Sequence, residues 1–60
     1  MRKKLKDERK KQKLTQQELA NKVGISRVHY TQIENNSKNP SLSVALSIKK
    51  VLNYAGDDLF

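Results

Sequence analysis

The chain has 60 residues with 13 Lys or Arg against 6 Asp or Glu, a formal net charge of +7, and no cysteine. A chain of this length buries only about 60% of its unfolded surface, so we expect one domain over residues 1–60 with a small core. The composition excludes disulfides and thiolate metal sites, and no apolar run is long enough for a membrane span or a secretory leader. We therefore expect a cytoplasmic protein.

Residues 2–12 predict a strongly basic first helix. Eight of the thirteen basic residues lie between positions 2 and 13, against two acidic ones. This concentration of positive charge favours binding to polyanions, either nucleic acid or an anionic membrane surface. A solvated helix face would account for some of these basic residues without any partner. Leu5 and the stem of Arg9 share one side and can pack inward, and an inward Arg needs a carboxylate in bidentate reach.

Residues 16–23 predict a second helix with signals at both ends. Thr15 can cap its start because Glu18, three residues on, completes a capping box. Gly24 can take the left-handed conformation that ends a helix. Two glutamines in the first turn lie near free backbone amides, where phosphate binds readily, although exposed glutamines are common: Gln16 and Gln17.

Residues 27 to about 35 predict a third helix that follows at once, with Ser26 as its cap. On a helical wheel Tyr30 and Ile33 fall on one side, with Glu34 beside them. The other side carries short uncharged groups and one flanking Arg: Arg27, Val28, Thr31, Gln32 and Asn35. Two helices this close in sequence must cross steeply, as in a helix-turn-helix.

The pattern T-x-x-E-L-A-x-x-x-G-I-S-x-x-x-x-x-x-I-E from Thr15, followed by N-P-S-L from Asn39, resembles the phage repressor and Cro-like helix-turn-helix family, the XRE family. The resemblance covers nearly the whole chain. It implies an all-α, compact five-helix bundle, a lambda-repressor-like DNA-binding domain whose third helix enters the major groove. It also implies that Arg9 pairs with Glu34, and that Gln16 contacts phosphate or braces the reading helix.

The third helix carries the candidate base readers. Arg27 can fork onto guanine, Gln32 can pair with adenine, and the methyl groups of Val28 or Thr31 can contact a thymine methyl. The family pattern places base readers at the positions of Arg27, Val28 and Gln32. His29 is the only histidine and has no partner of ligand type, so we expect a groove-edge contact or simple exposure and no metal site.

Residues 35–40 predict a polar loop. Asparagines tolerate left-handed geometry, and their amides, with Lys38, can donate to phosphate, although turn chemistry alone explains the asparagines equally well. The expected contacts to the DNA backbone are Gln16, Gln17, Ser26, His29, Asn35, Asn36 and Lys38.

Residues 42 to about 52 predict a fourth helix whose apolar arc spans about 220°, well beyond the roughly 100° that one packing face needs. Either the C-terminal residues or a second subunit must cover the extra width. Asp57 and Asp58 suit the first turn of a short fifth helix, with Leu59 and Phe60 docking onto the fourth. We expect a homodimer through the fourth helix and the C-terminal segment.

Three functions remain open. A sequence-specific transcriptional regulator of double-stranded DNA is favoured, most simply a dimeric repressor whose reading helices lie about 34 Å apart on a palindromic operator. A nonspecific polyanion binder would use the basic first helix alone. A protein-interaction module, such as an antitoxin, would use an exposed apolar patch at Val44, Ile48 and Val51. No nucleophile and base pair is visible, so neither an enzyme nor a cofactor is expected.

Overall fold

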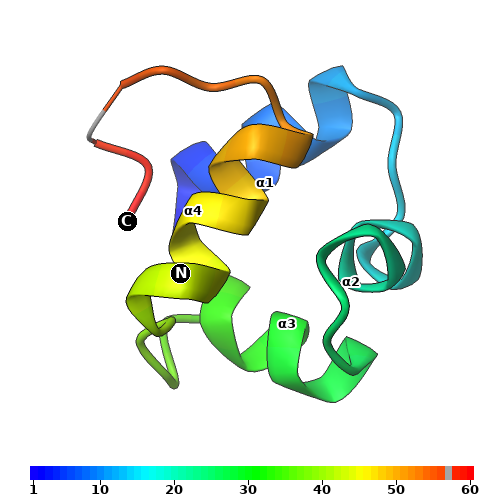
Figure 1. Cartoon of the computed structure of the whole chain (residues 1–60), viewed down its shortest axis with the longest axis vertical. Coiled ribbons are helices and arrows are strands. Elements are labelled where there is room, and N and C mark those ends of the chain that lie inside the picture. The colour runs from blue at the N-terminus through cyan, green and yellow to red at the C-terminus, as the bar shows by residue number, and fades with distance from the viewer. Residues whose placement is uncertain (57) are drawn as a thin grey trace.

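The computed structural model describes residues 1–56 and 58–60. Four helices lie in this part of the chain: α1 (Lys3–Lys11), α2 (Gln16–Val23), α3 (Arg27–Glu34) and α4 (Leu42–Val51). In Figure 1, α4 lies in front of α1, while α3 crosses below them and α2 stands beside α3. The all-α class and the four helix positions agree with the sequence predictions. None of the described helices is long and apolar enough to cross a bilayer.

The turn between α2 and α3 follows from the residues at the two helix ends. The Thr15 hydroxyl accepts from the Glu18 amide at 3.0 Å, and the Glu18 carboxylate accepts from the Thr15 amide at 2.8 Å, which confirms the capping box. Gly24 ends α2 with φ of 88°, in the left-handed region that glycine adopts without strain. The Ser26 hydroxyl then accepts from the His29 amide at 3.0 Å and starts α3. Only three residues, 24–26, therefore separate the two helices.

The hydrophobic core forms around the inner side of α3. Tyr30 and Ile33 are fully buried, as the helical wheel predicted. They pack with apolar residues from the other helices and from the C-terminal segment: Leu5, Leu19, Ala20, Ile48, Leu52 and Leu59. Because every other helix contributes to this cluster, the inner side of α3 is held by contacts with α1, α2 and α4.

The predicted fifth helix is not observed among the described residues. Residues 52–56 and 58–60 contain no helix, and Asp57, expected in its first turn, lies outside the described residues. Asp58 instead pairs with Lys4 of α1 at 2.6 Å and accepts a hydrogen bond from the Tyr54 hydroxyl. The Lys4–Asp58 pair links the C-terminal segment to α1, and in Figure 1 the C-terminus lies near the N-terminus. Leu59 docks as predicted and is buried.

The outer side of α4 differs from the predicted apolar patch. Ile48 is fully buried, and Val44 and Val51 are half-buried against the core, so the patch expected at these three positions is wrong. The reason is that α4 turns this side toward the core cluster, which α2 and Leu59 complete. The exposed apolar residues of α4 are instead Leu42 and Leu46, which are 77% and 55% exposed.

Candidate nucleic-acid interface

The outward side of α3 carries the residues predicted to read bases. Arg27 and Val28, in the first turn, are exposed, and 67% of the Val28 surface is open to solvent. Thr31 and Gln32 are half-buried, as is His29. The first turn of α3 is thus the most accessible part of the helix, and the outward side chains are less exposed toward its C-terminal end.

Gln16 in the first turn of α2 contacts α3 directly. Its Nε2 donates to Oε2 of Glu34 at 2.5 Å, and its Oε1 accepts from the Thr31 hydroxyl at 3.3 Å. Both ends of the amide are therefore engaged with α3. Of the two roles implied by the resemblance, these contacts fit the bracing of the reading helix. The neighbouring Gln17 donates to Asn21 Oδ1 at 2.9 Å and is exposed.

Glu34 is the last residue of α3, and its carboxylate is buried. Its Oε1 accepts from Arg9 Nε at 2.9 Å and from the Tyr30 hydroxyl at 3.0 Å. Only 2% of Glu34 and 8% of Arg9 is exposed. The ion pair implied by the resemblance is present, but it is not bidentate, because Arg9 Nη1 donates instead to the Leu14 carbonyl at 2.7 Å. Arg9 therefore joins α1 both to α3 and to the chain before α2.

These contacts change the acid–base chemistry of the cluster. Burial alone raises the pKa of Glu34, but hydrogen bonds from Arg9, Gln16 and Tyr30 outweigh it and hold the pKa below its usual value. Burial lowers the pKa of Arg9, but the hydrogen bond and negative charge of Glu34 raise it by more, so the pKa is raised overall. Burial, followed by the negative charge of Glu34, raises the pKa of the Tyr30 phenol. The ion pair and the neutral phenol therefore persist at neutral pH.

The lowered pKa of Glu34 predicts acid sensitivity with a definite sign. A depressed carboxyl pKa adds stability above the unfolded-state value, near 4.3 for Glu, and this part is lost as pH falls through the lower folded-state value. We expect the free energy of unfolding, from urea titrations, to decrease below about pH 4.5. Glu34→Gln should show a smaller decrease than the wild type, although not none, because the pKa values of Glu18 and Asp58 are also lowered. Parallel pH profiles for wild type and Glu34→Gln would contradict the assignment.

The loop between α3 and α4 brings the second group of predicted backbone contacts to the surface. Asn35, Asn36 and Lys38 are all exposed, and Asn36 has φ of 65°, the left-handed geometry for which asparagine was expected. The loop is tied back to α3, since the amides of Ser37 and Lys38 both donate to the Gln32 carbonyl. The sequence prediction missed a further residue here, Arg2, whose guanidinium contacts the loop from the other end of the chain.

Comparison with known proteins agrees with this geometry. The helix-turn-helix family profile matches residues 5–59. The chain belongs to the XRE family of helix-turn-helix proteins. It is similar to two uncharacterized HTH-type transcriptional regulators of Archaeoglobus fulgidus, at 42% and 40% identity over the whole chain, covering 86% and 84% of theirs. It is also 40% identical to the uncharacterized HTH-type transcriptional regulator MJ0272 of Methanocaldococcus jannaschii, over all of this chain and 91% of that one. No solved structure gave a significant match.

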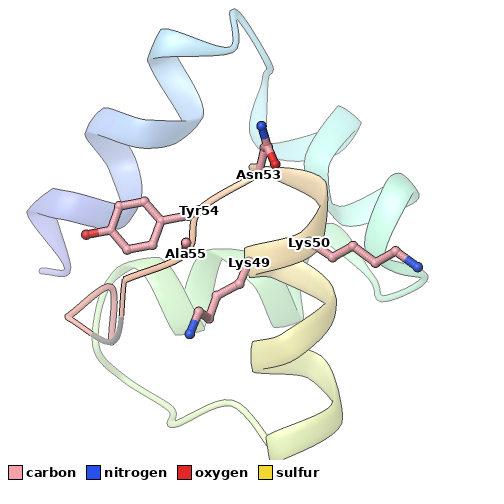
Figure 2. Close-up of a pocket in the computed structure, with 5 residues that line it drawn as sticks. All are labelled: Lys49, Lys50, Asn53, Tyr54 and Ala55. Atoms are coloured by element: carbon pink, nitrogen blue, oxygen red, sulfur yellow. The ribbon is translucent and has the colours of Figure 1, made fainter.

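In this XRE-family chain, the two lysines at the C-terminal end of α4 do not form a convergent anion site. A shallow hollow of about 200 Å³ lies at the C-terminal end of α4, and Figure 2 shows Lys49 and Lys50 pointing away from one another at its edge. Two diverging cations do not enclose an anion. Within residues 1–56 and 58–60 there is no group of His, Cys, Asp or Glu that could hold a metal ion.

Proposed function

We propose that this XRE-family chain is a sequence-specific, double-stranded-DNA-binding transcriptional regulator, which represses in the cytoplasm as a homodimer on a palindromic operator. Residues 1–60 act as one DNA-binding domain. The observation that carries the proposal is the division of α3 into two sides. Tyr30 and Ile33 are fully buried and fix the inner side of α3 in the core. Arg27 and Val28 are exposed at the end of α3 that would enter the major groove.

The base-reading roles follow from the groups that α3 leaves accessible. Arg27 has a guanidinium suited to the two acceptors of guanine, and Gln32 has an amide suited to adenine. Val28 offers methyl groups to thymine. The Thr31 hydroxyl already donates its hydrogen to Gln16, so its methyl group and the acceptor side of the hydroxyl oxygen remain for DNA.

Backbone contacts would flank this face on both sides. Gln17 and Ser26 lie near the start of α2 and α3, with His29 one turn further along. Asn35, Asn36 and Lys38 lie beyond the end of α3. Gln16 contributes through its hydrogen bonds to α3, and the second N–H of its Nε2 could donate to a phosphate without breaking either of them. Such contacts set the register of the helix but carry no base information.

The exposed leucines of α4 favour a dimer. Leu42 and Leu46 are one helical turn apart and therefore share a face, and at 77% and 55% they are among the most exposed large apolar residues of the chain. Phe60, 39% exposed, adds apolar surface from the C-terminal segment. A domain with a core this small gains stability by covering such a face with a second copy.

Leu46→Glu tests this dimer. We expect the variant to sediment as a monomer and to bind a full operator at least tenfold more weakly, because the second half-site is then no longer bound at a high effective concentration. Ser43→Glu is the matched control, since Ser43 is an exposed position of α4 that gains the same charge. Equal sedimentation and equal affinity of the two variants would remove Leu46 from the interface.

Selection from a pool of random duplex DNA tests the function itself. We expect enrichment of an inverted repeat whose half-sites lie about one helical turn apart. Bound DNA without any enriched sequence would instead indicate a polyanion binder that uses the basic residues of α1. Failure to retain DNA at moderate salt would favour a protein-interaction module.

A further inference from the structure

Arg2 connects the start of the chain to the loop that follows α3. Its Nη1 donates to Asn36 Oδ1 at 2.5 Å and its Nη2 donates to Asn39 Oδ1 at 2.7 Å. The same Nη1 donates to the Ile33 carbonyl at 3.3 Å, and the Arg2 amide donates to the Glu34 carbonyl at 2.8 Å. One residue therefore holds both the last carbonyls of α3 and two side chains of the loop.

The guanidinium of Arg2 points its two Nη groups toward the loop. Arg2 is half-buried, and its Cζ lies 5.8 Å from the centre of the Phe60 ring, within cation–π range. Its Nε is buried without a hydrogen-bond partner in the part of the chain that the structure describes. The side-chain hydrogen bonds of Arg2 are therefore made through Nη1 and Nη2.

These hydrogen bonds determine which end of each asparagine amide faces outward. A guanidinium has only donors, so each amide must turn its oxygen toward Arg2. The amide group is planar, and its NH₂ therefore points away from Arg2. Asn36 and Asn39 are both exposed, so these NH₂ groups are open to solvent on the loop beside the base-reading helix.

We propose that Arg2 is a positioning residue for DNA binding, which turns the NH₂ groups of Asn36 and Asn39 outward as a pair of neutral donors for backbone phosphate. The proposal rests on the function proposed above and adds two features to it, the role of Arg2 and the participation of Asn39. We expect Arg2 itself to contact no phosphate, because both N–H groups of Nη1 and one of Nη2 are engaged with the loop and with α3.

The test compares Arg2→Ala with Lys3→Ala, which removes the same charge from the neighbouring exposed position. We expect Arg2→Ala to bind every duplex, specific or random, about tenfold more weakly than Lys3→Ala, since hydrogen bonds to charged phosphate are lost. The slope of log affinity against log salt should match that of Lys3→Ala, because neutral donors release no counterions. Arg2→Lys should not restore binding, since one ammonium cannot hold two amides as the fork does.

Two loop variants keep the test decisive if Arg2→Ala does not fold. Asn36→Gly preserves the left-handed backbone while removing the amide, and Asn39→Ala removes the second amide. We expect each to weaken binding in a chain that keeps Arg2. Where Arg2→Ala does fold, neither loop substitution should weaken its binding further. A salt slope reduced by about 0.9 more in Arg2→Ala than in Lys3→Ala would show a direct phosphate contact and overturn the proposal. Unchanged affinity in both loop variants would overturn it as well.

The outcome separates this inference from the proposed function. If the wild-type chain selects no sequence, the proposed function fails, whatever Arg2 does. If the wild type selects an operator and Arg2→Ala binds it as well as Lys3→Ala does, only the role of Arg2 fails.

Discussion

Glu34→Ala should lower the free energy of unfolding by about 3–5 kcal/mol, because it leaves the charge of Arg9 buried without its partner. The same substitution removes the acceptor of the Tyr30 hydroxyl and of Gln16. A chain of this length has a total stability of about 3–9 kcal/mol, so the expected loss is about a third of the total or more. Urea unfolding followed by circular dichroism measures the change.

The control for Glu34→Ala is Lys11→Ala, which removes the exposed lysine of the Lys11–Glu8 pair and should change stability by no more than about 1 kcal/mol. Arg9→Ala should be nearly as damaging as Glu34→Ala, and the double variant should lose less than the sum of the two. A melting temperature for Glu34→Ala equal to that of the wild type would show that the pair does not stabilise the domain.

Arg27→Ala and Gln32→Ala should each relax base preference at one position of the half-site. A lost bidentate contact costs about 1–3 kcal/mol of discrimination, and a symmetric operator contains the contact twice, so the full site should lose about 2–6 kcal/mol. Both side chains lie on the outward side of α3, away from the core cluster, so stability should hardly change. Binding to a panel of single-base operator variants measures the preference at each position.

Lys38→Ala is the matched comparison, because Lys38 lies in the exposed loop and would contact phosphate rather than a base edge. We expect it to weaken all duplexes alike and to reduce the salt slope by about 1. Should Arg27→Ala also weaken every sequence by the same factor, Arg27 would be a backbone contact and base reading would have to come from other residues.

The helix-turn-helix could be predicted from the sequence because its signals are local. Thr15 and Glu18 lie three residues apart, and the left-handed turn at Gly24 depends on the absence of a side chain at that one residue. The inward side of α3 followed from helical periodicity, which placed Tyr30 and Ile33 together. Each of these features involves no more than a few consecutive turns of chain.

The features that the sequence did not reveal depend on contacts between distant residues. Periodicity showed that the apolar arc of α4 was too wide, but it could not show that the core would cover Ile48 and leave Leu46 exposed. Arg2 was one basic residue in a basic run, and its partners Asn36 and Asn39 lie more than thirty positions away. Likewise, only the folded arrangement shows that Gln16 joins the same carboxylate as Arg9.

Base reading by the outward face of α3 is tested most directly by one ratio, the affinity for a selected duplex divided by the affinity for the same duplex with its bases scrambled. Both affinities are measured at one salt concentration near physiological strength, since each alone depends steeply on salt. We expect a ratio of about 10³ or more for the wild type. A ratio near one would mean that the chain binds DNA through charge alone.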